Sequence, residues 1–270
     1  MIPLTAFLLR TILRGPWSAI ALVAFAAASG IVALLGLGSF RELGLRAVGP
    51  AAVAFLNLAL LLPTAQAVLL GALTVSTDRE TGFFAMVRAR GLGPGAVVGA
   101  AWLAVTVAAG LALAAGFGTV ALVLAGNVPT EELVTFVALF AATLGVTATA
   151  AAIGTLVGVV VRTRLHAALA ALAAWFFLAI GLDLVVIGLG AFLRAGEPAL
   201  IGAIVLNPFQ AGRILGLLLL DGTASVLGPL GIYLLDRLGP AGAGGLLGAA
   251  LGLWAIVPLA VARTWLARRD

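Results

Sequence analysis

The chain has 270 residues, of which 63% are hydrophobic and 9% are charged, so its composition excludes a water-soluble domain, which carries about a quarter charged residues. The formal net charge of +5 comes without a basic run interleaved with aromatic residues, which indicates attraction to anionic lipid headgroups and not nucleic-acid binding. Cysteine and lysine are absent, which excludes disulfides, thiolate nucleophiles and a Walker A loop, so another subunit would have to bind any ATP.

The residue pattern predicts an all-α, polytopic membrane protein that forms one transmembrane domain over residues 1–270. Residues 1–16 are expected to form an interfacial amphipathic helix on the membrane, because Arg10 and Arg14 lie one turn apart on a different side from the aliphatic residues. Six apolar runs long enough to cross a bilayer follow, at about 17–39, 51–75, 95–126, 132–161, 166–190 and 241–262.

Two of these runs contain glycines spaced by four residues. The spacing occurs at Gly154 and Gly158 in the fourth run and at Gly244, Gly248 and Gly252 in the sixth. Because small residues at this spacing let helix backbones approach closely, both stripes are candidate packing faces.

Residues 76–94 form the longest polar interruption in the first two-thirds of the chain, and the pattern predicts a short helix outside the membrane. Thr77 and Glu80 have the spacing of a capping box, in which the two side chains satisfy free backbone donors at a helix start. Arg88 and Arg90 fall in the predicted last turn, where the helix dipole favours cations. The predicted helix therefore begins near Thr77 and ends after Arg90.

One side of this short helix is expected to be apolar and buried. Phe83, Met86 and Val87 recur at i, i+3 and i+4, which places them on one helix face. The pattern fits an interfacial helix that rests on lipid headgroups, and it also fits a docking helix for a soluble partner.

The distribution of arginine predicts that both termini and this short helix are cytoplasmic. With that orientation, ten of the fifteen arginines lie on the inner side and five on the outer side, as the positive-inside rule requires.

The segment 191–240 is expected to hold outer-side short helices. Charged residues cut it into apolar pieces too short to cross a bilayer. We expect two re-entrant helices, about 209–220 and 223–237, packed against protein in the outer leaflet. The alternative is a seventh span, which would place the C-terminus outside.

Asp183 is the one acid within a predicted span, and such residues are functional candidates by default. It follows Arg164 by 19 residues, roughly 28 Å along a helix, which places it near the outer interface. This depth favours a structural carboxylate, bonded to the outer helices or to Arg194 or Arg213, over a proton relay. The sequence offers no metal site and no nucleophile–base pair, and His166 lies alone, so we expect no enzyme.

The order of these segments, with TDRETGFFAMVRARGLGP at 77–94, resembles the permease subunits of type-2 (exporter-type) ABC transporters. Three further segments, HAALAALAAWFFLAIGLDLVVIG, LNPFQAGRILGLLLLDG and VLGPLGIYLLDRLGP, look similar to the NosY branch. NosY is the permease of the NosDFY system, which matures the copper–sulfur centre of nitrous oxide reductase. One departure is that a Gly/Ala/Val run replaces the basic residue often found at the start of the next span.

The resemblance implies a homodimer in the cytoplasmic membrane of a prokaryote, with NosF-like ATPase subunits that bind ATP and Mg and a NosD-like periplasmic protein outside. The chain itself would hold no cofactor. The residues that would contact the ATPase are Asp78, Glu80, Gly82, Phe83, Phe84, Met86, Arg88 and Arg90. The outer gate or periplasmic contact would involve Asn207, Pro208, Arg213, Asp221, Gly228 and Pro229.

The implied function is ATP-driven export. Because cysteine is absent and methionine and histidine are scarce, copper is a poor candidate for the cargo, and a sulfur-containing species fits better. Two alternatives stay open: an ion-coupled carrier that uses Asp183, and a permease of the same family for another cargo such as a lipid or a drug.

Overall fold

The computed structural model describes residues 1–36, 50–125, 133–184, 197–220 and 228–269. Nearly all of these residues are helical, and none of them lies in a β-strand. Six helices are long and apolar enough to cross a membrane, which confirms the prediction of an all-α, multi-pass membrane protein. These spans are α2 (Pro16–Leu35), α4 (Pro50–Glu80), α6 (Pro94–Leu124), α7 (Leu133–Val160), α8 (Arg164–Phe176) with its continuation to Leu184, and α12 (Gly228–Arg269).

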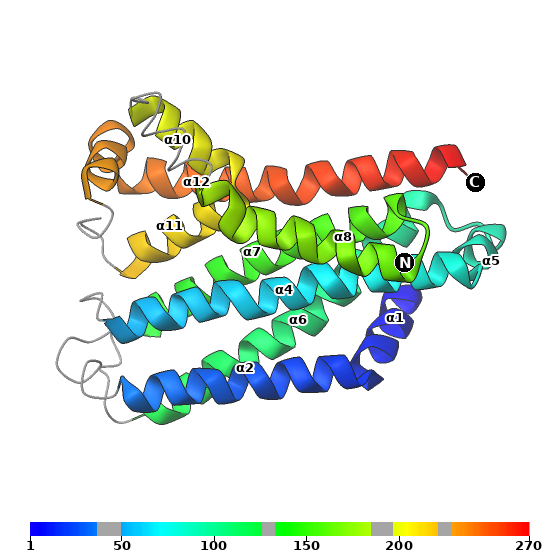
Figure 1. Cartoon of the computed structure of the whole chain (residues 1–270), viewed down its shortest axis with the longest axis horizontal. Helices are drawn as coiled ribbons and strands as arrows, with labels where there is room; N and C mark the ends of the chain where they lie inside the picture. Colours follow the sequence, from blue (N-terminus) through cyan, green and yellow to red (C-terminus); the bar gives the residue numbers. More distant parts are fainter. Residues whose placement is uncertain (37–49, 126–132, 185–196, 221–227, 270) are drawn as a thin grey trace.

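Shorter helices lie at the two ends of this bundle (Figure 1). Helix α1 (Ile2–Arg14), helix α5 (Phe83–Ala89) and both termini lie at one end, whereas α10 (Glu197–Leu206) and α11 (Pro208–Leu220) lie toward the other. The shared location of the termini and α5 agrees with an even number of spans, as predicted. Which end faces the cytoplasm stays a prediction.

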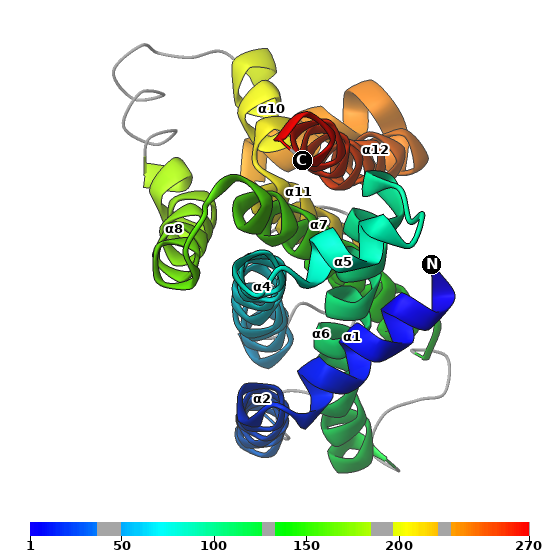
Figure 2. The same cartoon turned by 90° about the vertical axis from the view of Figure 1, so that its right-hand side faces the viewer.

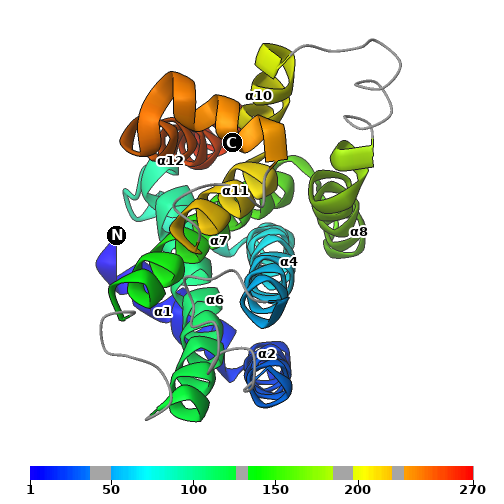
Figure 3. The same cartoon turned by 90° about the vertical axis from the view of Figure 1, so that its left-hand side faces the viewer.

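Helices α4 and α7 form the centre of the bundle. Figures 2 and 3 look along it from its two ends and show α4 between α2 and α8. Helix α7 contacts α4, α12, α6 and α11. In contrast, α8 contacts few other helices and is the least buried of the spans.

The α4–α7 contact depends on glycine. A Cβ atom added at Gly154 would lie 2.2 Å from the carbonyl oxygen of Val68, and one at Gly158 would lie 2.6 Å from that of Ala72. The backbones therefore touch, as the spacing of the first stripe predicts. At Gly244, Gly248 and Gly252 an added Cβ would meet no described atom within 4 Å, so the second stripe is not a packing face among the described residues.

Helix α1 confirms the predicted amphipathic helix. Its aliphatic side, with Leu4, Leu8 and Ile12, is buried, and Arg10 and Arg14 are exposed. The helix crosses the end of the bundle and contacts α6 (Figure 2). Much of the apolar face that we expected to rest on lipid therefore packs on protein.

The predicted helix start at Thr77 is wrong. Helix α4 continues to Glu80, and the amide of Thr81 still donates to the carbonyl of Thr77 at 3.0 Å. The chain leaves the helix only at Gly82, whose φ of 73° is left-handed, a conformation that glycine adopts at low cost. Segment 76–94 thus holds the last turn of α4, a turn, the short helix α5, and a second turn.

The segment 191–240 contains α10, α11 and the first turns of α12. Helix α11 matches the expected helix at 209–220, and Gly228–Leu238 overlaps the expected 223–237, whereas α10 was not expected. A left-handed φ of 68° at Gly239 separates the first turns of α12 from its long span. Among the described residues, no helix here adds a seventh span; Asp221 lies outside them.

Candidate functional site

The predicted docking residues gather at one corner of the bundle, residues 78–94, which we call the α5 corner. Two glycines shape it, because Gly82 and Gly91 have left-handed φ values of 73° and 90°. An added Cβ would meet no described atom at either position, so backbone conformation, not space, favours glycine here. These turns reverse the chain between α4 and α6 and present α5 at the end of the bundle.

The buried side of α5 differs from the predicted one. Phe84 and Val87 are buried, with 3% and 7% of their surfaces exposed, whereas Met86 is 49% exposed. Phe83 is half-buried and stacks on Phe7 of α1, with ring centroids 5.3 Å apart. Because the helix starts at Phe83, after a left-handed residue, Phe84 faces the bundle and Met86 faces away from it.

Polar side chains of the α5 corner bond to three spans other than α4 and α6. The carboxylate Oε1 of Glu80 accepts from the amide of Arg164, the first residue of α8, at 2.6 Å. The guanidinium of Arg79 donates to the carbonyl of Val159 in α7. Arg88 donates to the carbonyl of Leu266 in α12 at 3.5 Å.

These bonds correct the predicted role of Glu80. Its carboxylate binds the start of another helix instead of capping its own, which satisfies one of the free donors at the N-terminus of α8. Asp78 is half-buried, and its Oδ2 has no hydrogen-bond partner among the described residues. Arg90 is exposed.

A shallow hollow of about 440 Å³ adjoins α5. It lies between this helix and the start of α6, and its lining includes Arg88, Gly91, Gly93 and Pro94.

The predicted outer residues do not form one exposed surface. Asn207 is 1% exposed and caps α11, because its Oδ1 accepts from the amide of Phe209 at 3.0 Å. Pro208 is buried as the first residue of α11, and Arg213 is exposed. Gly228 and Pro229 begin α12.

Asp183 belongs to the same buried junction. The amide Nδ2 of Asn207 donates to its Oδ1 at 3.2 Å, and the positive charge of Arg213 also acts on this carboxylate. Both partners lie at or in α11, which favours the structural interpretation of Asp183. Among the described residues, no group of three or more His, Cys, Asp or Glu could hold a metal ion.

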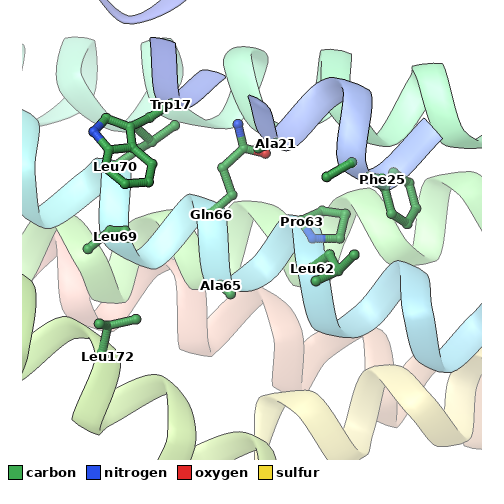
Figure 4. Close-up of a pocket in the computed structure, with 11 residues that line it drawn as sticks. Trp17, Ala21, Phe25, Leu62, Pro63, Ala65, Gln66, Leu69, Leu70 and Leu172 are labelled. Carbon is green, nitrogen blue, oxygen red and sulfur yellow. The ribbon is translucent and has the colours of Figure 1, made fainter. Parts of the chain in front are cut away.

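An apolar pocket on the side of the bundle was not predicted. It encloses about 210 Å³ between α2, α4 and α8, and Trp17, Phe25, Pro63 and Gln66 line it (Figure 4). The Nε2 atom of Gln66 is buried and has no hydrogen-bond partner among the described residues. In the sequence, the one sign of this pocket is the polar residue Gln66, which follows Pro63 by three residues within an apolar run.

Comparison with protein-family models gives no match, and comparison with curated proteins gives none either.

Proposed function

We propose that this chain is the membrane-spanning subunit of an ATP-driven ABC exporter, and that the α5 corner is its contact with a separate ATPase subunit. One observation carries the proposal: the short helix α5 and the last turn of α4 before it are bonded to the ends of three other spans. The lack of lysine, and hence of a Walker A loop, supports a partner that binds ATP and Mg.

The bonds of the α5 corner suit it to transmit force. Phe84 and Val87 are buried and hold α5 against the bundle. Movement of α5 relative to the spans would expose these two apolar side chains. A push on α5 would act on α4 through the chain, on α7 through Arg79 and on α8 through Glu80. A coupling element needs such connections, because a small shift at one site is passed on through the elements bonded to it.

The exposed side chains of α5 and of Arg90 after it indicate what kind of ATPase surface would bind them. Met86 offers a flexible apolar side chain, which adapts to irregular clefts. Arg90 adds a positive charge beside the hollow near Arg88. The ATPase would therefore present an apolar cleft flanked by acidic residues.

The remaining features of the proposal rest on the resemblance. The permease would be a homodimer in the cytoplasmic membrane of a prokaryote, with both termini cytoplasmic and NosF-like ATPases below. A NosD-like periplasmic protein would contact the end that carries α10 and α11. The cargo would be a sulfur-containing species for copper–sulfur centre maturation.

The test is co-purification with candidate ABC-type ATPases of the same genome. Met86→Glu combined with Arg90→Glu should abolish binding and coupled ATP turnover, since it reverses the exposed chemistry of α5 without touching its buried side. Leu238→Glu with Arg237→Glu is the matched control, because both residues are exposed and lie away from the α5 corner. If the α5 variant binds the ATPase as well as this control does, the docking assignment is wrong.

A further inference from the structure

Helix α8 contains a π-helical turn. The span is α-helical over Arg164–Phe176, continues as η2, a π-helix over Phe177–Gly181, and then resumes helical geometry to Leu184. Single π-turns within α-helices are rare and concentrate at functional sites. They also break the regular hydrogen-bond ladder, so a helix bends there more readily than elsewhere.

The side chain of Asn207 binds this turn. Its Nδ2 donates to the carbonyl of Leu178 at 2.9 Å, while its Oδ1 caps α11 by accepting from Phe209. The same Nδ2 lies 3.2 Å from Oδ1 of Asp183, two residues beyond the π-turn. Asn207 thus bonds to both the π-turn and the residues that follow it.

The two parts of α8 are held by different neighbours. Before the π-turn, the amide of Arg164 binds Glu80, and the indole Nε1 of Trp175 donates to Oγ1 of Thr64 in α4 at 3.1 Å. From the π-turn onward, Leu178 and Asp183 are bonded to Asn207 at the start of α11. The π-turn therefore lies between the part of α8 that is bonded to α4 and the part that is bonded to Asn207.

We infer that the π-turn is a hinge in α8, and that Asn207 is a positioning residue that holds it in the present geometry. The part of α8 before the turn moves with α4 and the α5 corner. The part after it stays with α11. The idea that an ATPase drives this hinge depends on the proposed function. The existence of the hinge does not depend on it.

The hinge can be measured without any partner. Because the chain has no cysteine, pairs of introduced cysteines can carry spin labels in lipid nanodiscs. One pair, Leu35→Cys with Leu184→Cys, joins α2 to α8 beyond the hinge. The other, Trp17→Cys with Leu165→Cys, joins the same helices before it. All four side chains are exposed.

Asn207→Ser should broaden the distance distribution of the Leu35–Leu184 pair and leave the Trp17–Leu165 pair unchanged. Serine still caps α11, but it is too short to reach Leu178. Deletion of Ala179 shortens the π-turn by one residue toward an α-helical turn, and in this background Asn207→Ser should no longer broaden the distribution.

Equal broadening of both pairs, or of neither, would overturn the hinge. An ATPase that fails to bind would overturn the proposed function alone, since these distances need no ATPase.

Discussion

Replacing Gly154 with alanine should weaken the central contact of the bundle, whereas the same change at Gly145 in the same helix should not. A Cβ atom at Gly154 would lie 2.2 Å from the carbonyl oxygen of Val68 and 2.8 Å from its Cα. Ordinary contacts need about 3.5 Å, so the two backbones would have to separate by about 1 Å. At Gly145 an added Cβ would meet no described atom within 4 Å.

The size of the effect follows from two opposing terms. Overpacking a tight site costs about 1–3 kcal/mol, and alanine gains about 1 kcal/mol over glycine within a helix. The obstacle at Gly154 is backbone, which cannot rotate away. Gly158 and Gly71 also approach the facing helix closely, since an added Cβ would lie 2.6 Å and 2.8 Å from the nearest atom. A shift of the helices at Gly154 would therefore disturb these contacts too. The two terms together give a net loss of about 1 kcal/mol for Gly154→Ala, whereas Gly145→Ala should gain about 1 kcal/mol.

The assay is reversible unfolding in mixed micelles by added SDS, followed by tryptophan fluorescence. The two alanine variants should differ by about 2 kcal/mol in the free energy of unfolding, with Gly154→Ala the less stable. Equal stability of the two would refute the close approach of α4 and α7.

Three further changes test other parts of the structure. Met86→Cys should react with a membrane-impermeant maleimide only from the cytoplasmic side, because Met86 is exposed on the α5 corner; labelling from outside would reverse the proposed orientation. Trp175→Phe should lower the free energy of unfolding by about 0.6 kcal/mol, since it removes an interhelical hydrogen bond to Thr64, and an unchanged unfolding curve would contradict that bond. Asp183→Asn should keep ATP-driven transport, because an amide oxygen still accepts from Asn207; lost transport would favour an ion-coupled carrier.

The spans could be predicted because a bilayer imposes a simple rule on length and polarity. Helix ends were harder, as Thr77 and Glu80 illustrate. Their spacing fits a capping box, yet the same residues also fit the last turn of a long helix, and the left-handed residue Gly82 decides where that helix ends. A local motif cannot tell a helix start from a helix end when polar residues occur at both.

Tertiary contacts explain the other differences. Gly154 and Gly248 each belong to a stripe with the same spacing, but only the first meets another backbone. The expected helix at 209–220 agrees with α11, yet nothing in the sequence says that the Asn207 amide before it is buried and binds α8. The π-turn has no sequence signature that we could use.

The polar bonds of this chain also constrain how it can move. Glu80, Arg79 and Asn207 each bond to the backbone of a different helix, and the first two lie at the α5 end. The bonds of Arg79 and Asn207 are partly buried, where little water can replace a broken bond, so separation of their partners is costly. The first part of α8 is then attached to α4 at the α5 end, and the end of α8 is attached to the start of α11. The π-turn lies between these two attachments, so a relative movement of the two parts of α8 would bend the helix there.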